Sequence, residues 1–185
     1  PHLQARMPSF DYTDEEWNDL ISYFQQKDNL DLIYEDPHNF TLNSSSFKAG
    51  ERIAEMGACI NCHFYGAEKP KQDALTWAPN LVLTKERLRP EWLVEWFINP
   101  QDVMPGTKMP APYIPTEEPQ NSIREVWGSD VAKISRDSTK LYKSLIDWMW
   151  GMEGRKDVSS IVKRHLNSQG YGFIIEEEDD WGDEW

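Results

Sequence analysis

Residues 59–63 read C-I-N-C-H, and this stretch decides how the rest of the chain is interpreted. Two residues separate the cysteines, a histidine follows at once, and the 185 residues contain no other cysteine. A redox-active disulfide would need a βαβ pattern around it, which is missing. A structural disulfide would close a loop too short to remove much chain entropy. A zinc site would have three local ligands at most, and no suitable spacing connects it to the remaining histidines, His2, His38 and His165.

Covalent attachment of a haem is the fourth interpretation, and it is the meaning that this spacing most often carries. Two thiols separated by one helical turn can reach the two vinyl groups on one edge of the porphyrin. A histidine directly after the second thiol then lies under the ring and directs its imidazole at the iron. We therefore predict one covalently attached haem c, with thioether bonds to Cys59 and Cys62 and with His63 as an axial iron ligand.

An iron held by one histidine needs a ligand on its opposite face, and residues 105–110, P-G-T-K-M-P, offer Met109. Without the cysteine motif, Met109 would be interpreted as a residue that fills a gap in a loop core. A methionine between prolines is poorly suited to a helix but well placed on a stiff loop. Its thioether is soft and favours ferrous iron, so that histidine–methionine ligation raises the reduction potential. The sequence predicts Met109 as the second axial ligand.

The two motifs together resemble those of class I cytochromes c, whose methionine loop looks like residues 99–109, N-P-Q-D-V-M-P-G-T-K-M. The resemblance covers residues 47–112 and a helix near 138–150. It implies a mostly α fold, that of a cytochrome c-like helical haem domain with long loops and terminal extensions. Within A-P-N-L, it also implies that the carbonyl of Pro79 accepts a hydrogen bond from the imidazole of His63 and so fixes its tautomer.

The terminal helices show one further likeness to that family and two departures. The family's helix before the haem motif crosses its final helix, and Gly50 precedes Cys59 at the distance where such domains often place a glycine. The aromatic residue usually found near position 54 is replaced by Ala54. The final helix comes late, after an apparent insertion at about 113–137. These departures concern the packing of the helices and not the expected iron ligands.

Hydrophobic periodicity and turn residues divide the chain into four parts. Residues 1–30 hold a capped amphipathic helix that resembles the end of an upstream cytochrome c domain, since Met7-Pro8 echoes Met109-Pro110. On this hypothesis the chain is a C-terminal fragment or domain of a multihaem cytochrome; the alternative is that the helix packs on the haem domain. The other parts are a linker at 31–46, the monohaem domain at 47–150, and a helix with an acidic tail at 151–185.

Five helices are expected, and the prolines between them predict loops. The first begins at the Thr13–Glu16 capping box, and the last has Asp157 as its cap. The six prolines between positions 100 and 119 predict an extended loop and no helix. Residues 116–137 are polar and show no clear period. The other helices are expected at 47–56, at 90–98 and from about 138 to 150.

Other aromatic residues and histidines have less specific roles. One tryptophan is expected to donate its indole N–H to a haem propionate, as in several members of the family. His165 lies on an apolar helix stripe and is expected to be a packing residue, and His38 is expected at the surface. The candidates for the propionate contact are Trp77, Trp92 and Trp96.

The charge of the chain restricts its partners. The net charge is −13, and the last ten residues alone hold seven acidic side chains, which argues against nucleic acid as a partner. The acidic chain instead predicts a redox partner protein with a basic docking patch, and other cytochrome subunits or domains are further candidates. No stretch is long and apolar enough for a transmembrane helix.

The predicted function is electron transfer and not enzymatic catalysis, as a shuttle or as a subunit of a larger respiratory redox complex. Haem attachment of this type places the chain in the periplasm or elsewhere outside the cytoplasm, where partner subunits could hold it at a membrane. The alternative is a haem enzyme or gas-binding sensor with an open or displaceable sixth ligand. Lys108 lies beside Met109, but no histidine is close enough in sequence to serve as a distal acid or base.

Overall fold

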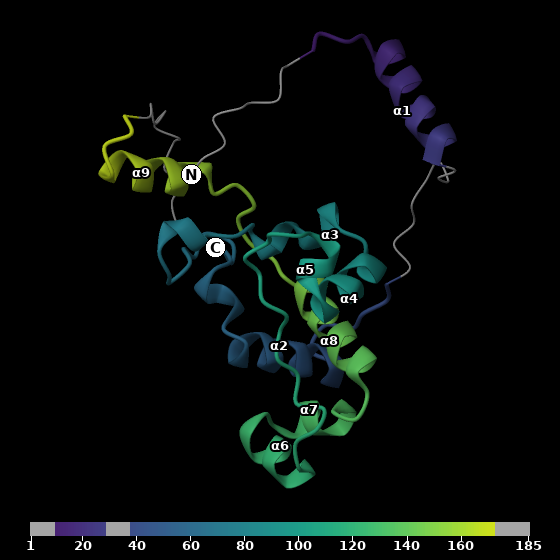
Figure 1. Cartoon of the computed structure of the whole chain (residues 1–185), viewed down its shortest axis with the longest axis vertical. Coiled ribbons are helices and arrows are strands. Elements are labelled where there is room, and N and C mark those ends of the chain that lie inside the picture. The colour runs from purple at the N-terminus through teal and green to yellow at the C-terminus, as the bar shows by residue number, and fades with distance from the viewer. Residues whose placement is uncertain (1–9, 29–37, 173–185) are drawn as a thin grey trace. The chain divides into compact units, whose positions relative to one another are not determined.

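A computed structural model describes residues 10–28 and 38–172 of the chain, which falls into two compact units, residues 1–37 and 38–185 (Figure 1). The described residues are mostly helical, as predicted. They form no sheet and only two isolated bridges, His63 with Ala78 and Tyr65 with Glu68. None of the helices in these ranges is long and apolar enough to cross a membrane.

The first unit contains helix α1 (Asp14–Asp28), and its predicted capping box is present. The Thr13 N–H donates to Glu16 Oε2 at 2.8 Å, and the Glu16 N–H donates to Thr13 Oγ1 at 3.3 Å. Tyr12 packs edge-on against Trp17, with ring centroids 5.1 Å apart, in the arrangement of a hydrophobic staple. The apolar stripe of α1 is exposed within this unit: Trp17 by 43%, Ile21 by 50% and Phe24 by 50%. Met7 and His2 lie outside the described residues.

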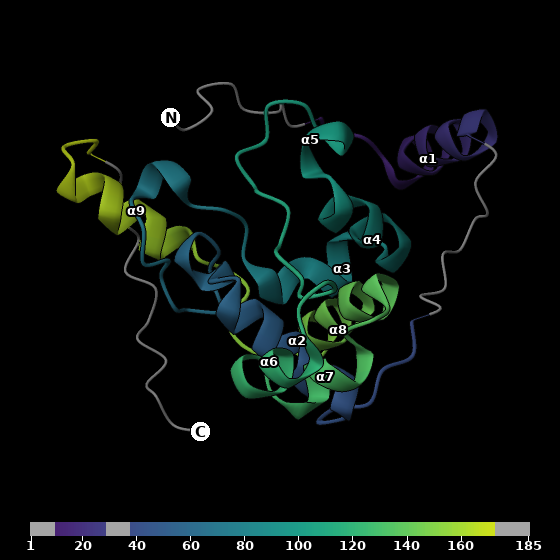
Figure 2. The same cartoon turned by 60° about the horizontal axis from the view of Figure 1, so that its bottom comes forward.

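The core of the second unit is the crossing of α2 (Ser45–Met56) with α8 (Ser138–Trp150), which lie side by side in both views (Figure 2). Gly50 makes the crossing close, because a Cβ at this position would lie 1.8 Å from the backbone oxygen of Ser144. The helix α2 is capped at its start by Ser44, whose Oγ accepts from the Phe47 N–H at 3.1 Å. Ala54 is buried in the core near this crossing. It occupies the position at which class I cytochromes c usually have an aromatic residue.

The middle of the chain forms short helices around this core. They are the 3₁₀ turns η1 (Cys59–Asn61), η2 (Ala74–Thr76) and η3 (Leu81–Leu83), then α3 (Thr84–Arg87), α4 (Pro90–Ile98) and α5 (Pro100–Val103). The boundaries predicted for α4 are confirmed, with Pro90 in its first turn. The prediction of no helix after position 100 is wrong for α5, since proline at the first helical position costs no hydrogen bond.

The region expected as an insertion folds into two helices, α6 (Gln120–Val126) and α7 (Ser129–Ile134); α7 packs on α2, and α6 packs on α7 (Figure 2). Sequence reasoning found no helical period here because the helices are short and most of their residues are polar. Few apolar side chains anchor them, but these are buried deeply in the shared core: Ile123, Trp127, Val131 and Ala132.

Two further differences concern the ends of the second unit. Phe40, which lies in the stretch predicted as a linker, packs against the core. The expectation that His38 lies at the surface is wrong: its Nε2 lies 2.7 Å from Asp147 Oδ1, and both side chains are only about one-tenth exposed. Helix α9 (Ser159–Ser168) follows α8; its N-cap residue is Val158 and not the predicted Asp157, although Asp157 Oδ1 accepts from the Ser159 N–H at 2.8 Å.

Candidate functional site

The two cysteines lie in a tight turn directly after α2. The helix ends when the Gly57 N–H bonds to the Ile53 carbonyl at 2.8 Å, and Ala58 then adopts a left-handed conformation with φ +52°. The N–H groups of Cys62 and His63 both donate to the carbonyl of Cys59, at 3.3 and 3.0 Å. The two thiols are therefore one turn apart. Both are free and half-buried.

The environment of Cys59 distinguishes between the chemical interpretations of the motif. Burial raises the pKa of its thiol to about 11. A redox-active or zinc-binding cysteine needs the opposite shift, because the thiolate is the reactive form. In residues 10–28 and 38–172, no three His, Cys, Asp or Glu side chains come together as metal ligands. The raised pKa of Cys59 disfavours the thiolate that thiol–disulfide exchange and zinc binding both use.

The imidazole of His63 is held in one orientation. Its Nδ1 lies 2.8 Å from the carbonyl oxygen of Pro79, the contact that the family resemblance implies. A carbonyl only accepts, so Nδ1 carries the proton and Nε2 keeps its lone pair. Burial lowers the pKa of His63, opposed in part by the hydrogen bond to Pro79. The ring is therefore kept neutral, which is the form that binds metals.

The segment that carries Pro79 is aligned with the cysteine motif by backbone hydrogen bonds. The Ala78 N–H donates to the Cys62 carbonyl at 2.8 Å, and the Leu81 N–H donates to the Phe64 carbonyl at 3.0 Å. Between these two bonds the two segments run parallel with Ala78 paired to His63, which brings the carbonyl of the next residue, Pro79, within reach of the imidazole. The orientation of the imidazole thus depends on a loop that is distant in sequence.

Met109 lies on the predicted loop and packs its half-buried side chain against the main core. Its Sδ accepts the indole N–H of Trp96 at 2.8 Å. The neighbouring Lys108 donates from Nζ to the carbonyl of Leu75 at 3.3 Å, which connects the methionine loop to the loop that follows the cysteine motif. Another methionine of the same region, Met104, is 55% exposed.

The tryptophans proposed for a propionate contact have other partners. The indole of Trp77 donates to the carbonyl of Gln72 at 3.0 Å, and that of Trp96 donates to Met109. Trp92 stacks on Trp96, with ring centroids 5.0 Å apart. His165 packs as expected, with its ring centroid 4.7 Å from that of Trp77. The propionate role stays a prediction for all three tryptophans.

Sequence reasoning missed one residue of this region, Asn80, although the A-P-N-L stretch that contains it stood out. Asn80 is 5% exposed, and its side chain makes hydrogen bonds to both neighbouring loop segments. The available signal was the position of this asparagine, directly after Pro79. The hydrogen-bond partners of Asn80 are backbone groups, however, and the sequence does not identify which residues supply them.

The donor groups present fit a covalently attached haem. The chain offers two free thiols one turn apart, an imidazole with its Nε2 lone pair available, and a thioether packed against the core. These are the groups that c-type attachment and histidine–methionine ligation use.

No protein-family model, no curated protein and no solved structure matches this chain. The assignment of function therefore rests on the residues and their geometry.

Proposed function

We propose that this chain carries one haem c, bound covalently through Cys59 and Cys62, and that it transfers single electrons with His63 and Met109 as axial ligands. The observation that carries the proposal is the hydrogen bond from His63 Nδ1 to the carbonyl of Pro79, at 2.8 Å. It orients the imidazole that follows two free thiols and leaves Nε2 for the iron. When bound, the haem supplies an iron that alternates between its ferric and ferrous forms.

The protein's part in this function is to hold the ligands still and keep water away. Phe64, next to His63, is 4% exposed and packs edge-on against Trp77 at 5.2 Å between ring centroids. Trp92 and Trp96 form a stacked pair on the side of Met109. Large rigid side chains of this kind favour a site in which little has to move when the charge of the iron changes. The proposal includes a location outside the cytoplasm, where haem attachment of this type takes place.

The proposed redox partner follows from where the charges lie. Residues 38–172 hold 17 Lys and Arg against 16 Asp and Glu, so the negative charge of the chain comes from residues 1–37 and 173–185. A basic docking patch on a partner would be attracted by those terminal segments. Lys69 and Lys108 instead lie on the two loops next to the motifs, and Leu75 between them is 65% exposed. Association through either surface should weaken with salt.

Absorption spectra of the purified protein, oxidised and reduced, test the proposal. We expect c-type bands in the reduced protein and, in the oxidised protein, the weak near-infrared band of methionine–iron ligation. Met109→Leu should abolish the near-infrared band and keep the c-type bands. Met104→Leu is the matched control, because this methionine is exposed, and it should change neither. A protein purified after expression with haem-attachment machinery that shows no c-type bands would refute the proposal.

The Trp96–Met109 contact supports a second candidate, a gas-binding sensor or haem enzyme with a displaceable sixth ligand. An indole N–H that donates to the sulfur engages one of its two lone pairs and so competes with the iron for Met109. Carbon monoxide separates the two candidates. A tightly ligated His63/Met109 iron should resist carbon monoxide in the reduced protein, whereas a displaceable Met109 should give the carbon monoxide spectrum within seconds.

A further inference from the structure

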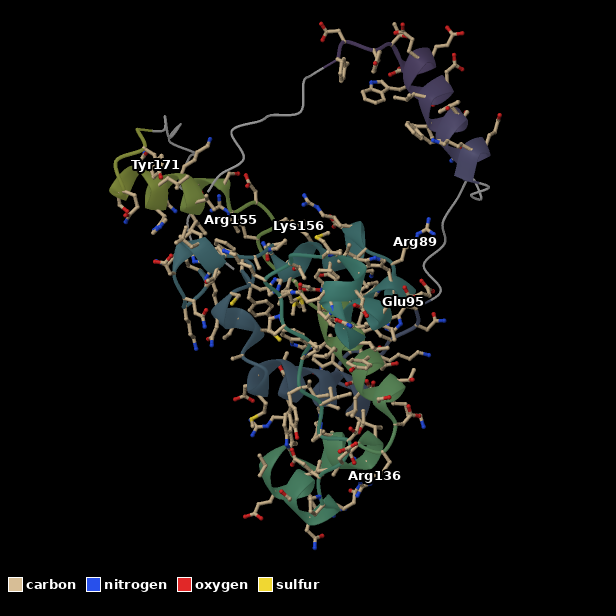
Figure 3. All side chains as sticks on the ribbon, viewed as in Figure 1. Arg89, Glu95, Arg136, Arg155, Lys156 and Tyr171 are labelled. Atoms are coloured by element: carbon tan, nitrogen blue, oxygen red, sulfur yellow. The ribbon has the colours of Figure 1, made fainter. Side chains whose placement is uncertain are left out.

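The segment between α8 and α9, residues 152–158, crosses the loop that carries Pro79, and we refer to it as the clamp. Figure 3 labels two of its residues, Arg155 and Lys156, on the stretch that leads to α9. Met152 anchors its start in the core and is 8% exposed. The clamp lies beyond the part of the chain that the cytochrome c resemblance covers, so the resemblance assigns it no role.

Asn80 connects the clamp to the site. Its Nδ2 donates to the carbonyls of Arg155 and Lys156, at 2.9 and 3.1 Å. Its Oδ1 accepts the N–H of Gly66 at 3.1 Å and that of Val82 at 3.3 Å. A buried asparagine with both ends of its amide bonded in this way has one allowed orientation.

The clamp also touches the site loop through backbone and charge. Gly154, at φ +138°, lies against Gly66: a Cβ on Gly154 would make an ordinary van der Waals contact with the Gly66 Cα, at 3.6 Å. Lys156 pairs with Glu86 of α3. An open hollow of about 500 Å³ lies between part of the clamp and the loop, with Pro79 and Lys156 among its lining residues. The clamp therefore acts on this part of the loop through hydrogen bonds and not through close packing on the proline.

The geometry points to a function for the clamp: it positions the Pro79 carbonyl toward His63 by way of Asn80. The carbonyl of Pro79 and the N–H of Asn80 belong to one planar peptide group, so fixing Asn80 fixes the direction of that oxygen. The oxygen in turn holds the Nδ1 proton of His63. Asn80 is thus a positioning residue for the imidazole, and its relevance to iron ligation rests on the proposed function.

Exchange of the His63 Nδ1 proton with solvent measures this positioning directly, by NMR of histidine-labelled protein in haem-free and reduced haem-loaded forms. Asn80→Asp has the same shape and keeps the acceptor but loses both donors to the clamp. We expect exchange about tenfold faster, the factor that corresponds to losing one to two net hydrogen bonds. The reduction potential of the haem-loaded variant should rise, because a weaker hydrogen bond to Nδ1 makes the imidazole a poorer donor.

A second variant reaches the clamp without touching Asn80. Gly154→Ala strains the backbone of the clamp, because a φ of +138° is disfavoured for a residue with a side chain, and it should also speed exchange. Gly170→Ala is its matched control, because Gly170 also has a positive φ, +89°, but a Cβ there would have no atom within 4 Å, and exchange should be unchanged. If Asn80→Asp does not fold, Gly154→Ala decides. Wild-type exchange in a folded Gly154→Ala or Asn80→Asp protein would overturn the inference.

The experiments distinguish a failure of the proposed function from a failure of the clamp inference. A chain without c-type bands refutes haem binding, but the exchange of the Nδ1 proton in the haem-free protein still tests the clamp. Normal spectra with unchanged exchange in both variants refute the clamp and leave electron transfer intact.

Discussion

Replacing Gly50 with alanine should destabilise the domain, although helix propensity alone predicts the opposite. Alanine is favoured over glycine inside a helix by about 1 kcal/mol. A Cβ at Gly50, however, would lie 1.8 Å from the carbonyl oxygen and 2.4 Å from the carbonyl carbon of Ser144. Overpacking a core costs about 1–3 kcal/mol when side chains can adjust. Here the obstacle is the backbone of a buried helix, so we expect a net loss of about 3 kcal/mol or more.

Urea unfolding followed by far-UV circular dichroism measures this loss, through the midpoint and the extrapolated free energy. Glu51→Ala is the control, because this neighbour on the same helix is exposed, and its effect should stay within about 0.5 kcal/mol. Adding Ser144→Ala to Gly50→Ala should not restore stability, since the conflict is with backbone atoms. A Gly50→Ala protein as stable as the wild type would show that α2 and α8 do not cross at this distance.

Two further predictions concern pH and the α6–α7 region. Burial lowers the pKa of His63 in the folded, haem-free protein below its value in the unfolded chain, about 6.5. The neutral imidazole therefore contributes its full stability above about pH 6.5. That stability is lost as the pH falls from there through the lower pKa of the folded state. His63→Asn should remove that part of the pH dependence in unfolding curves, and parallel curves for the two proteins would contradict it. Ile123→Ala should cost about 2–5 kcal/mol, because the side chain is fully buried. Val126→Ala, on the same helix but 44% exposed, should cost far less, and equal losses would mean that α6 does not anchor the domain.

The helices that sequence predicts well are those whose signals are local. α4 begins at Pro90 and ends at Asn99 because proline suits the first turn and the Asn-Pro pair stops the helix. α8 begins after Asp137, whose carboxylate accepts from the Lys140 N–H at 3.1 Å. In both cases a cap and an apolar period coincide within one stretch. The prediction that His63 contacts Pro79 was based on the family resemblance and not on a local signal of this kind.

The features that sequence reasoning missed depend on distant partners. The His38–Asp147 pair joins residues that are 109 positions apart, and neither position carries a pattern that reveals the other. Helices α6 and α7 are too short for a period to emerge, and their stability depends on tertiary packing, of α7 on α2 and of α6 on α7. The partners of Asn80 are backbone carbonyls, which every residue type supplies.

The restraints on His63 come from separate parts of the chain and differ in strength. The α2–α8 crossing holds the cysteine turn from one side and is buried throughout the helix core. The Pro79 loop is held by backbone bonds to Cys62 and Phe64, and the clamp adds the bonds through Asn80. The clamp is the most exposed of these restraints, because Lys156 and its partner Glu86 are both about half exposed and an open hollow lies beside Lys156. Local opening requires least free energy where few apolar contacts are lost, so the clamp should open before the helix crossing does. Under the proposed function, the orientation of the imidazole would therefore be the first property of the site to change under mild destabilisation, while the covalent thioether bonds keep the haem in place.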